Sequence, residues 1–264
     1  MGAASIELPN SLDELKSRVD GLGQASDWES AVQLCEGYLR TTRDIQTEAY
    51  GLLGDCRYQL AFQQGTRDAF KEEILRAREA YSQAGDKRSM ARNAFCSHWV
   101  SDDLEERRNI IMGECIPLGR EATMENSEAA RPRAELLIYL SSGCAIASDR
   151  TELLKLADEA KRVGDEAFSR FCKGRKGNES DAVLVGNAYS QFLFIASGNM
   201  IDENESARIS SEIAPVLISM AQNPKGAGLM RSLTYETAGF MAFEFLGDPP
   251  MAEGLFDKAL TEGE

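Results

Sequence analysis

Apolar residues recur at intervals of three and four along most of the chain, the spacing that places them on one face of an α-helix. Leu12, Leu15 and Val19 form the first such stripe. It follows a capping box, in which Ser11 and Glu14 are spaced to satisfy the amide groups of a helix start. Alternating β-branched runs bounded by turns, the pattern typical of strands, do not occur. The hydrophobic pattern therefore predicts an all-α protein.

Similar start signals divide the rest of the chain into about twelve helices joined by short loops. Asp149 and Asp202, for example, are each followed by a Glu three residues later. The predicted spans are 11–23, 27–41, 44–64, 67–84, 87–100, 102–122, 127–147, 150–172, 180–200, 203–222, 226–246 and 249–262. Pro117 and Pro215 fall inside two of these spans, where proline normally kinks or breaks a helix, so each is a candidate boundary.

A Gly-Asp dipeptide follows an apolar helical run at three places, Gly85-Asp86, Gly164-Asp165 and Gly247-Asp248. Glycine readily takes the left-handed conformation that ends a helix, and aspartate caps the start of the next one. The three dipeptides lie 79 and 83 residues apart, which is about two repeats of roughly 40 residues each. The pattern predicts a helical-repeat protein with helix boundaries at these dipeptides, except that the flanks of Gly164-Asp165 could also continue one helix, as in the span 150–172.

Three segments of the chain, one of which begins at Gly247-Asp248, resemble tetratricopeptide repeats. Two segments are similar to the second helix of that repeat. The first contains Gly247, Asp248, Ala252, Phe256, Ala259 and Leu260, and the second contains Asp27, Trp28, Ala31, Tyr38 and Leu39. Similar to the first helix, in which a small residue lets the paired helix approach closely, are Ala49, Tyr50, Leu53, Gly54 and Cys56. The resemblance implies a right-handed α-α superhelix, a TPR-like solenoid of about six antiparallel helix pairs, whose concave face binds a protein or peptide.

The domain organisation predicted from this pattern is simple. Residues 11–264 form a single TPR-like helical-repeat domain, because stacked helix pairs share one continuous core. A disordered N-terminal segment, residues 1–10, precedes it. Ala259 and Leu260 close a repeat near the end of the sequence, so a fragment of a longer protein is an open alternative.

Composition narrows the function. The chain of 264 residues has a formal net charge of −14, which disfavours binding to a nucleic-acid backbone. Its single histidine, His98, argues against zinc sites with several histidines and against Ser-His-Asp hydrolases. The six cysteines are 19 to 40 residues apart, so no CxxC motif exists and small buried thiols are expected. We therefore predict no metal and no cofactor.

Residues 182–201 contain no charged side chain and invite a transmembrane interpretation. Asn187 and Gln191 argue against it, because amide side chains are costly in hydrocarbon. The first residues of the chain lack the basic and apolar regions of an export signal. We expect a cytoplasmic protein without a membrane-bound segment, in which this helix is enclosed by its neighbours.

Candidate partner-binding residues recur on the polar face of alternate predicted helices. They are Asp55, Tyr58, Arg88, Arg92, Asn187, Gln191, Thr237 and Glu244. Arg88 and Arg92, one turn apart, could clamp a carboxylate or simply form a solvated helix face. Asn187 and Gln191 could bind a peptide backbone in the groove, and an internal network between adjacent helices is an equally weighted alternative.

Two further motifs have alternative interpretations. Asp102 and Glu106 share a helix face, as the magnesium ligands of all-α isoprenoid enzymes do, but no convincing second acidic helix accompanies them. Acidic residues also favour the first turn of a helix on dipole grounds. The loop 173–177 carries three basic residues between glycines, and it is interpreted as an exposed linker because the phosphate-loop spacing is missing.

The sequence favours a non-catalytic scaffold or adaptor that binds a protein or peptide, not an enzyme. Its acidic charge favours neutral or basic partners through long-range attraction. Two alternatives stay open: a sensory or regulatory domain that binds a small ligand or signalling peptide, and a magnesium-dependent enzyme centred on Asp102 and Glu106.

Overall fold

The computed structural model describes residues 8–42, 47–173, 179–198, 200–222 and 228–263. These residues contain no strand, and the structure is 86% helical. Within these ranges, twelve helices pack against their neighbours when α-helices that are joined by a π-helical turn are counted as one. The all-α class and the predicted number of helices are confirmed. The right-handed superhelix of six antiparallel pairs stays a prediction.

The helices follow the apolar stripes closely. The first part of the chain contains α1 (Leu12–Gln24), α2 (Trp28–Thr41), α3 (Thr47–Ala61), α4 (Arg67–Ala84), α5 (Lys87–Val100), α6 (Leu104–Ile110), the π-helix η1 (Ile111–Cys115) and α7 (Ile116–Glu125). The second part contains α8 (Ala130–Ala145), α9 (Arg150–Ala167), the π-helix η2 (Phe168–Lys173), α10 (Glu179–Ser197), α11 (Glu203–Arg208), the π-helix η3 (Ile209–Ile213), α12 (Ala214–Gln222), α13 (Gly228–Leu246) and α14 (Pro249–Gly263).

Two of the three Gly-Asp dipeptides separate helices as predicted. Gly85 and Gly247 have φ angles of 70° and 60°, and the side chains of Asp86 and Asp248 accept amide hydrogen bonds of the following helix. Gly164-Asp165 lies inside α9, so here the alternative of a continuous helix is correct and a boundary at this dipeptide is not. The regular spacing of about 80 residues therefore does not mark equivalent boundaries.

A π-helical turn explains why Pro117 and Pro215 do not end their helices. In η1 the amide of Ile116 donates to the carbonyl of Ile111, five residues earlier, and in η3 Ala214 donates to Ile209 in the same way. Each proline follows directly, within the first two residues of α7 or α12. The wider turn makes room for a ring that would otherwise clash with the carbonyl four residues earlier. Neither proline is a helix boundary.

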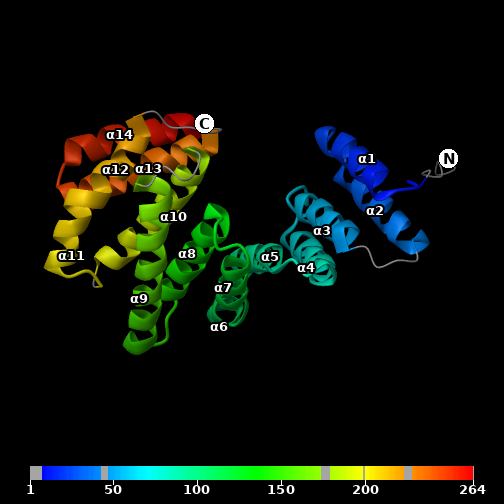
Figure 1. Ribbon diagram of the computed structural model, residues 1–264, viewed down its shortest axis with the longest axis horizontal. Coiled ribbons are helices and arrows are strands. Elements are labelled where there is room, and N and C mark those ends of the chain that lie inside the picture. The colour runs from blue at the N-terminus through cyan, green and yellow to red at the C-terminus, as the bar shows by residue number, and fades with distance from the viewer. Residues whose placement is uncertain (1–7, 43–46, 174–178, 199, 223–227, 264) are drawn as a thin grey trace. The chain divides into compact units, whose positions relative to one another are not determined.

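The chain divides into two compact units, Met1–Glu121 and Ala122–Glu264. In unit 1, α1 to α5 pack one against the next in chain order, and η1 packs on α5 (Figure 1). Apolar residues of α1, α2 and α3, such as Leu15, Leu34 and Ala49, form the core of its first three helices. The single domain over residues 11–264 stays a prediction.

In unit 2, α10 lies at the centre of the packing and contacts α8, η2, α12 and α13 (Figure 1). When α11, η3 and α12 are counted as one continuous helix, helices two steps apart along the chain lie side by side, α8 with α10 and α10 with α13. The last pair, α13 and α14, packs tightly because the ring of Phe256 covers Gly239, where a Cβ would lie 2.6 Å from it. The close approach over a small residue that was expected in the segment 49–56 is present there as well, where Tyr81 of α4 covers Gly54 of α3.

The N-terminal segment, residues 1–10, was expected to be disordered. Pro9 is buried and Leu8 packs on Gly37, so the expected N-terminal disorder concerns at most residues 1–7, which lie outside the described residues.

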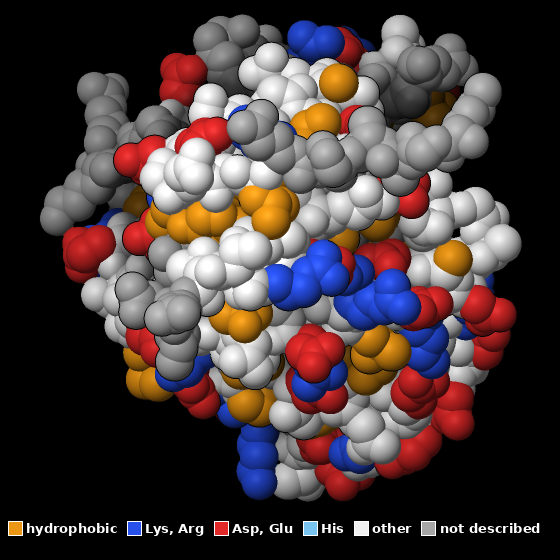
Figure 2. Space-filling view, turned by 90° about the vertical axis from the view of Figure 1, so that its right-hand side faces the viewer, with side chains coloured by type: hydrophobic (Ala, Val, Ile, Leu, Met, Phe, Trp, Pro, Cys, Tyr) orange, Lys and Arg blue, Asp and Glu red, His pale blue; other side chains and the backbone are white. Residues whose placement is uncertain are grey.

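No helix in the described part of the chain has the length and apolar character needed to cross a membrane. On the face in Figure 2, Lys and Arg side chains form a short band bordered by Asp and Glu side chains.

Candidate functional site

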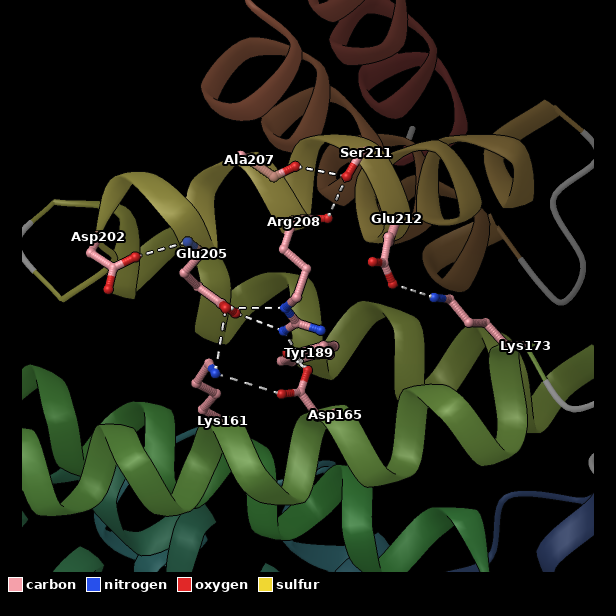
Figure 3. Close-up of polar contacts among 10 residues, drawn as sticks. All are labelled: Lys161, Asp165, Lys173, Tyr189, Asp202, Glu205, Ala207, Arg208, Ser211 and Glu212. Atoms are coloured by element: carbon pink, nitrogen blue, oxygen red, sulfur yellow. Dashed lines mark hydrogen bonds and ion pairs between the residues drawn. The ribbon is translucent and has the colours of Figure 1, made fainter.

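Five side chains from three helices meet in unit 2 and form a neutral ionic cluster (Figure 3). Lys161 and Asp165 come from α9, Tyr189 from α10, and Glu205 and Arg208 from α11. We call these residues the unit 2 cluster. It joins three helices that are consecutive along the chain, and so it fixes their spacing.

Arg208 is the centre of the unit 2 cluster. Its Nη2 lies 2.6 Å from Glu205 Oε1 and 2.7 Å from Asp165 Oδ1, and its Nε lies 3.0 Å from Glu205 Oε2. The hydroxyl of Tyr189 donates to Asp165 Oδ1 over 2.5 Å. Lys161 Nζ lies 3.4 Å from Glu205 and 3.9 Å from Asp165. Two cations thus neutralise two carboxylates.

The local sequence explains how Tyr189 reaches Asp165. Gly164 precedes this aspartate on α9, and any Cβ at that position would overlap the Tyr189 ring. Tyr189 is fully buried, and its burial raises the pKa of the phenol, so the hydroxyl stays protonated and donates. Hydrogen bonding to Glu205 raises the pKa of Arg208, which remains a cation.

A cavity of about 450 Å³ lies beside this cluster. Its lining combines apolar with polar and charged residues, and it comes from α9, α10, α11 and the connection before α11. The residues are Leu154, Ala157, Asp158, Lys161, Phe192, Leu193, Ala196, Met200, Ile201, Asp202, Asn204, Glu205 and Arg208. A volume of this size is typical of small-ligand and side-chain binding pockets.

The charge at the border of the unit 2 cavity is negative. Lys161 and Arg208 are its two cations, and Asp158, Asp202 and Glu205 are its three carboxylates, which leaves one excess negative charge. Both cations already contact carboxylates of the unit 2 cluster. The arrangement can therefore hold an apolar group and attract a single positive charge beside it.

Unit 1 contains a smaller cluster that repeats the Asp-Tyr-Arg part of the unit 2 cluster. The hydroxyl of Tyr81, on α4, donates to Asp55 Oδ1 of α3 over 2.8 Å. Arg92, on α5, donates to the same hydroxyl over 3.2 Å and lies 3.7 Å from Asp55. The guanidinium of Arg92 also stands 4.4 Å from the ring centre of Tyr58. We call Asp55, Tyr81 and Arg92 the unit 1 cluster.

The unit 1 cluster also depends on a glycine. A Cβ at Gly54 would lie 2.6 Å from the ring of Tyr81, which is fully buried. Burial raises the pKa of Tyr81, so its hydroxyl also remains a donor. A cavity of about 420 Å³ borders this cluster, lined by Val19, Asp20, Gly23, Gln24, Trp28, Leu52, Asp55, Cys56, Gln59 and Arg92.

Sequence reasoning found only part of these two clusters. Asp55, Tyr58 and Arg92 were predicted and lie together, whereas Tyr81, Tyr189 and Arg208 were missed. The available signal was a repeated Gly-Asp pair with a tyrosine later in the chain: Gly54-Asp55 before Tyr81, and Gly164-Asp165 before Tyr189. Gly54 and Asp55 were considered separately, and Gly164-Asp165 was a possible helix boundary, so neither pair was connected with its tyrosine.

Asn187 and Thr237 are not accessible to a partner. Asn187 donates through Nδ2 to Thr234 Oγ1 over 3.3 Å, and its Oδ1 accepts from Thr237 Oγ1 over 3.0 Å. All three residues are buried between α10 and α13. Asn187 and Thr237 therefore belong to an internal network between helices, which was the alternative considered for Asn187. Such a network gives each buried polar group a hydrogen-bond partner.

The other predicted residues lie apart from the unit 2 cavity lining. Gln191 is half-buried on α10, and Glu244 is exposed on α13. Arg88 is half-buried on α5, one turn before Arg92.

The acidic pair considered as a magnesium site instead joins two helices. Asp102 forms an ion pair with Arg67, and Glu106 lies 3.1 Å from Lys71. Arg67 and Lys71 both belong to α4. No three His, Cys, Asp or Glu side chains within the described ranges come together as metal ligands would. In the basic loop, Lys173 lies 2.9 Å from Glu212, while residues 174–177 lie outside the described residues.

The cysteines are thiols, and only Cys172 is not fully buried. Burial raises the pKa of Cys144 to about 11 and that of Cys172 to about 12, so both remain protonated near neutral pH. Small buried thiols were the expectation, and it is confirmed for the other five.

No family model matches the chain, and no curated protein matches it.

Proposed function

We propose that this protein is a non-catalytic, peptide-binding helical-repeat protein, and that the unit 2 cavity holds an apolar side chain of its partner. A Lys or Arg of the partner, next to that side chain, faces the carboxylates at the cavity border. The partner is thus a peptide or protein segment with an apolar residue beside a basic one.

The cavity beside the unit 2 cluster is the observation that carries this proposal. Leu154, Phe192, Leu193, Met200 and Ile201 offer an apolar lining within a volume of about 450 Å³. An apolar side chain that leaves water for such a lining gains roughly 1.5–3 kcal/mol when fully buried. The ionic cluster holds α9, α10 and α11 together, so the lining is already formed before a ligand arrives.

Charge supports a basic neighbour for that apolar residue. The cavity border has one excess negative charge, and the whole chain has a formal net charge of −14. The border charge and the net charge both attract an approaching cation. The long-range attraction by the net charge also raises the association rate of a basic peptide. A peptide with an acidic residue at the same place meets repulsion instead.

The packing of unit 2 is compatible with a helical repeat. With α11, η3 and α12 counted as one helix, every second helix packs on the next, α8 on α10 and α10 on α13, as the first helices of stacked helix pairs do. Membership in a TPR-like family and the superhelix belong to the proposal, because they rest on the residues quoted for the resemblance. Proteins of this architecture usually bind extended peptides.

The test compares two leucines of unit 2. Leu154 lines the cavity and is 41% exposed, whereas Leu246, at the end of α13, is 39% exposed and does not line it. Peptides are first selected against the intact protein from a random displayed library. Affinity of a selected peptide is then measured by calorimetry for Leu154→Glu and for the matched control Leu246→Glu.

We expect Leu154→Glu to weaken the selected peptide at least about tenfold, which corresponds to about 1.4 kcal/mol. Leu246→Glu should change the affinity less than about twofold, because it adds the same charge away from the cavity. Selected sequences should contain an apolar residue next to Lys or Arg. The proposal is overturned if no peptide is enriched, or if both variants bind the peptide as well as the unmodified protein does.

A further inference from the structure

We infer that unit 1 contains a second binding site of the same chemistry, the cavity lined by Trp28 and Leu52 next to the unit 1 cluster. The site takes an apolar side chain with an adjacent positive charge, so one chain binds two such peptide motifs. This inference rests on the proposed function, which it extends from one site to two.

The first argument is the correspondence of the two clusters. In each unit, a Gly-Asp pair on one helix receives a buried tyrosine from the next helix and an arginine from the helix after that. In both, the tyrosine ring occupies the space above the glycine and its hydroxyl donates to the aspartate. The same three-helix arrangement has therefore been built twice in this chain.

The second argument is that both arrangements border a cavity of similar size. The cavities measure about 420 Å³ in unit 1 and about 450 Å³ in unit 2, and the cluster arginine lines each of them. Cavities of about 490 and 470 Å³ also lie beside the ion pairs of Arg57 and of Lys71, so volume alone does not mark a site. The two cavities compared here share, in addition, the Asp-Tyr-Arg arrangement at their border.

The third argument is the chemistry of the unit 1 lining. Trp28 packs with one part on the core of α1, α2 and α3, and it also lines the cavity together with Leu52. Asp20 and Asp55 are the carboxylates at the border and Arg92 is the cation, which again leaves one excess negative charge. An aromatic face and a carboxylate are both favourable neighbours of a Lys or Arg side chain.

Arg92 does not cancel this preference, because its charge is already engaged. It contacts Asp55 and the hydroxyl of Tyr81, and it lies over the ring of Tyr58. Asp20, from α1, is the remaining charged side chain of the lining. We therefore assign to Asp20 the contact with the positive charge of the peptide.

Trp28 makes the site directly observable. The sequence has two tryptophans, and the other one, Trp99, is 62% exposed on α5 and does not line this cavity. In a Trp99→Phe background, Trp28 is the only source of tryptophan fluorescence. The experiment titrates the selected peptide into this protein, with and without Leu154→Glu, and follows the fluorescence of Trp28.

We expect a saturable change of Trp28 fluorescence that persists in the Leu154→Glu variant, and two peptides bound per chain by calorimetry when both sites are intact. Asp20→Lys should weaken the affinity measured at Trp28 at least about fivefold, since it replaces attraction by repulsion. The matched control is Asp13→Lys, on the same helix but outside the cavity lining, and it should change this affinity less than about twofold.

The outcomes separate this inference from the proposed function. If Leu154→Glu abolishes binding and Trp28 never responds, unit 2 binds the peptide and the second site is overturned. If Trp28 responds but Asp20→Lys and Asp13→Lys act alike, the assigned role of Asp20 is overturned. If neither Trp28 nor the Leu154→Glu comparison reports binding, the proposed function fails together with this inference.

Discussion

Two glycines decide whether the clusters can form, because each one makes room for a tyrosine ring. Gly54 and Gly164 lie inside helices, where glycine lowers stability by about 1 kcal/mol relative to alanine. Here the missing side chain lets Tyr81 and Tyr189 reach the aspartate next to each glycine. The ordinary preference for alanine is therefore reversed at these two positions.

Gly164→Ala should lower the free energy of unfolding by about 1–2 kcal/mol, because the new methyl group overlaps the Tyr189 ring and this outweighs the helix-propensity gain. Gly254→Ala in α14 is the matched control, since nothing lies within 4 Å of its Cβ position. It should raise stability by up to about 1 kcal/mol. Urea unfolding of both variants measures the difference, and changes of the same sign would contradict the role of Gly164.

The local sequence could predict which amide a helix-capping side chain binds, but it could not predict which residues meet in the two clusters. Ser11 and Asp149 bind amides three residues away, so their role is visible in the local sequence. Asp165 meets Arg208 across 43 residues, and this contact depends on which helices pack together. The same holds for Asn187, whose buried partners lie 47 and 50 residues away on α13.

At the scale of helices, the π-turns show how a sequence keeps a helix running through a proline. The hydrophobic pattern correctly continued through Pro117 and Pro215, while the usual effect of proline argued for a break. Both principles hold, because the chain inserts a wider turn directly before each proline. Sequence reasoning could not place this turn, since its apolar residues continue the same helical stripe.

Because η3 already accommodates its ring, Pro215→Ala should change the free energy of unfolding by less than about 1 kcal/mol. Glu236→Pro gives the contrast, since this exposed residue lies within α13 and no π-turn precedes it. It should cost about 3 kcal/mol or more. Thermal or urea unfolding tests both, and a gain near 3 kcal/mol for Pro215→Ala would show that the proline is strained.

At the scale of the whole molecule, the sequence predicted the class and number of helices, and much less of the site. Start signals and apolar periodicity are local, so the twelve helices emerged nearly at their observed bounds. The cavities lie between helices and depend on side chains from three or four of them. Only the acidic charge of the chain indicated in advance which partners these cavities would favour.

The location of the bound peptide tests the central claim most directly. Met200 lines the unit 2 cavity, while Met251, on α14, is 41% exposed and does not line it. With ¹³C-methyl-labelled methionine, and with Met200 assigned through Met200→Leu, the selected peptide should shift the Met200 signal at the affinity found by calorimetry. The Met251 signal should stay in place. If the protein is saturated with the peptide and the Met200 methyl signal does not shift, the account is contradicted.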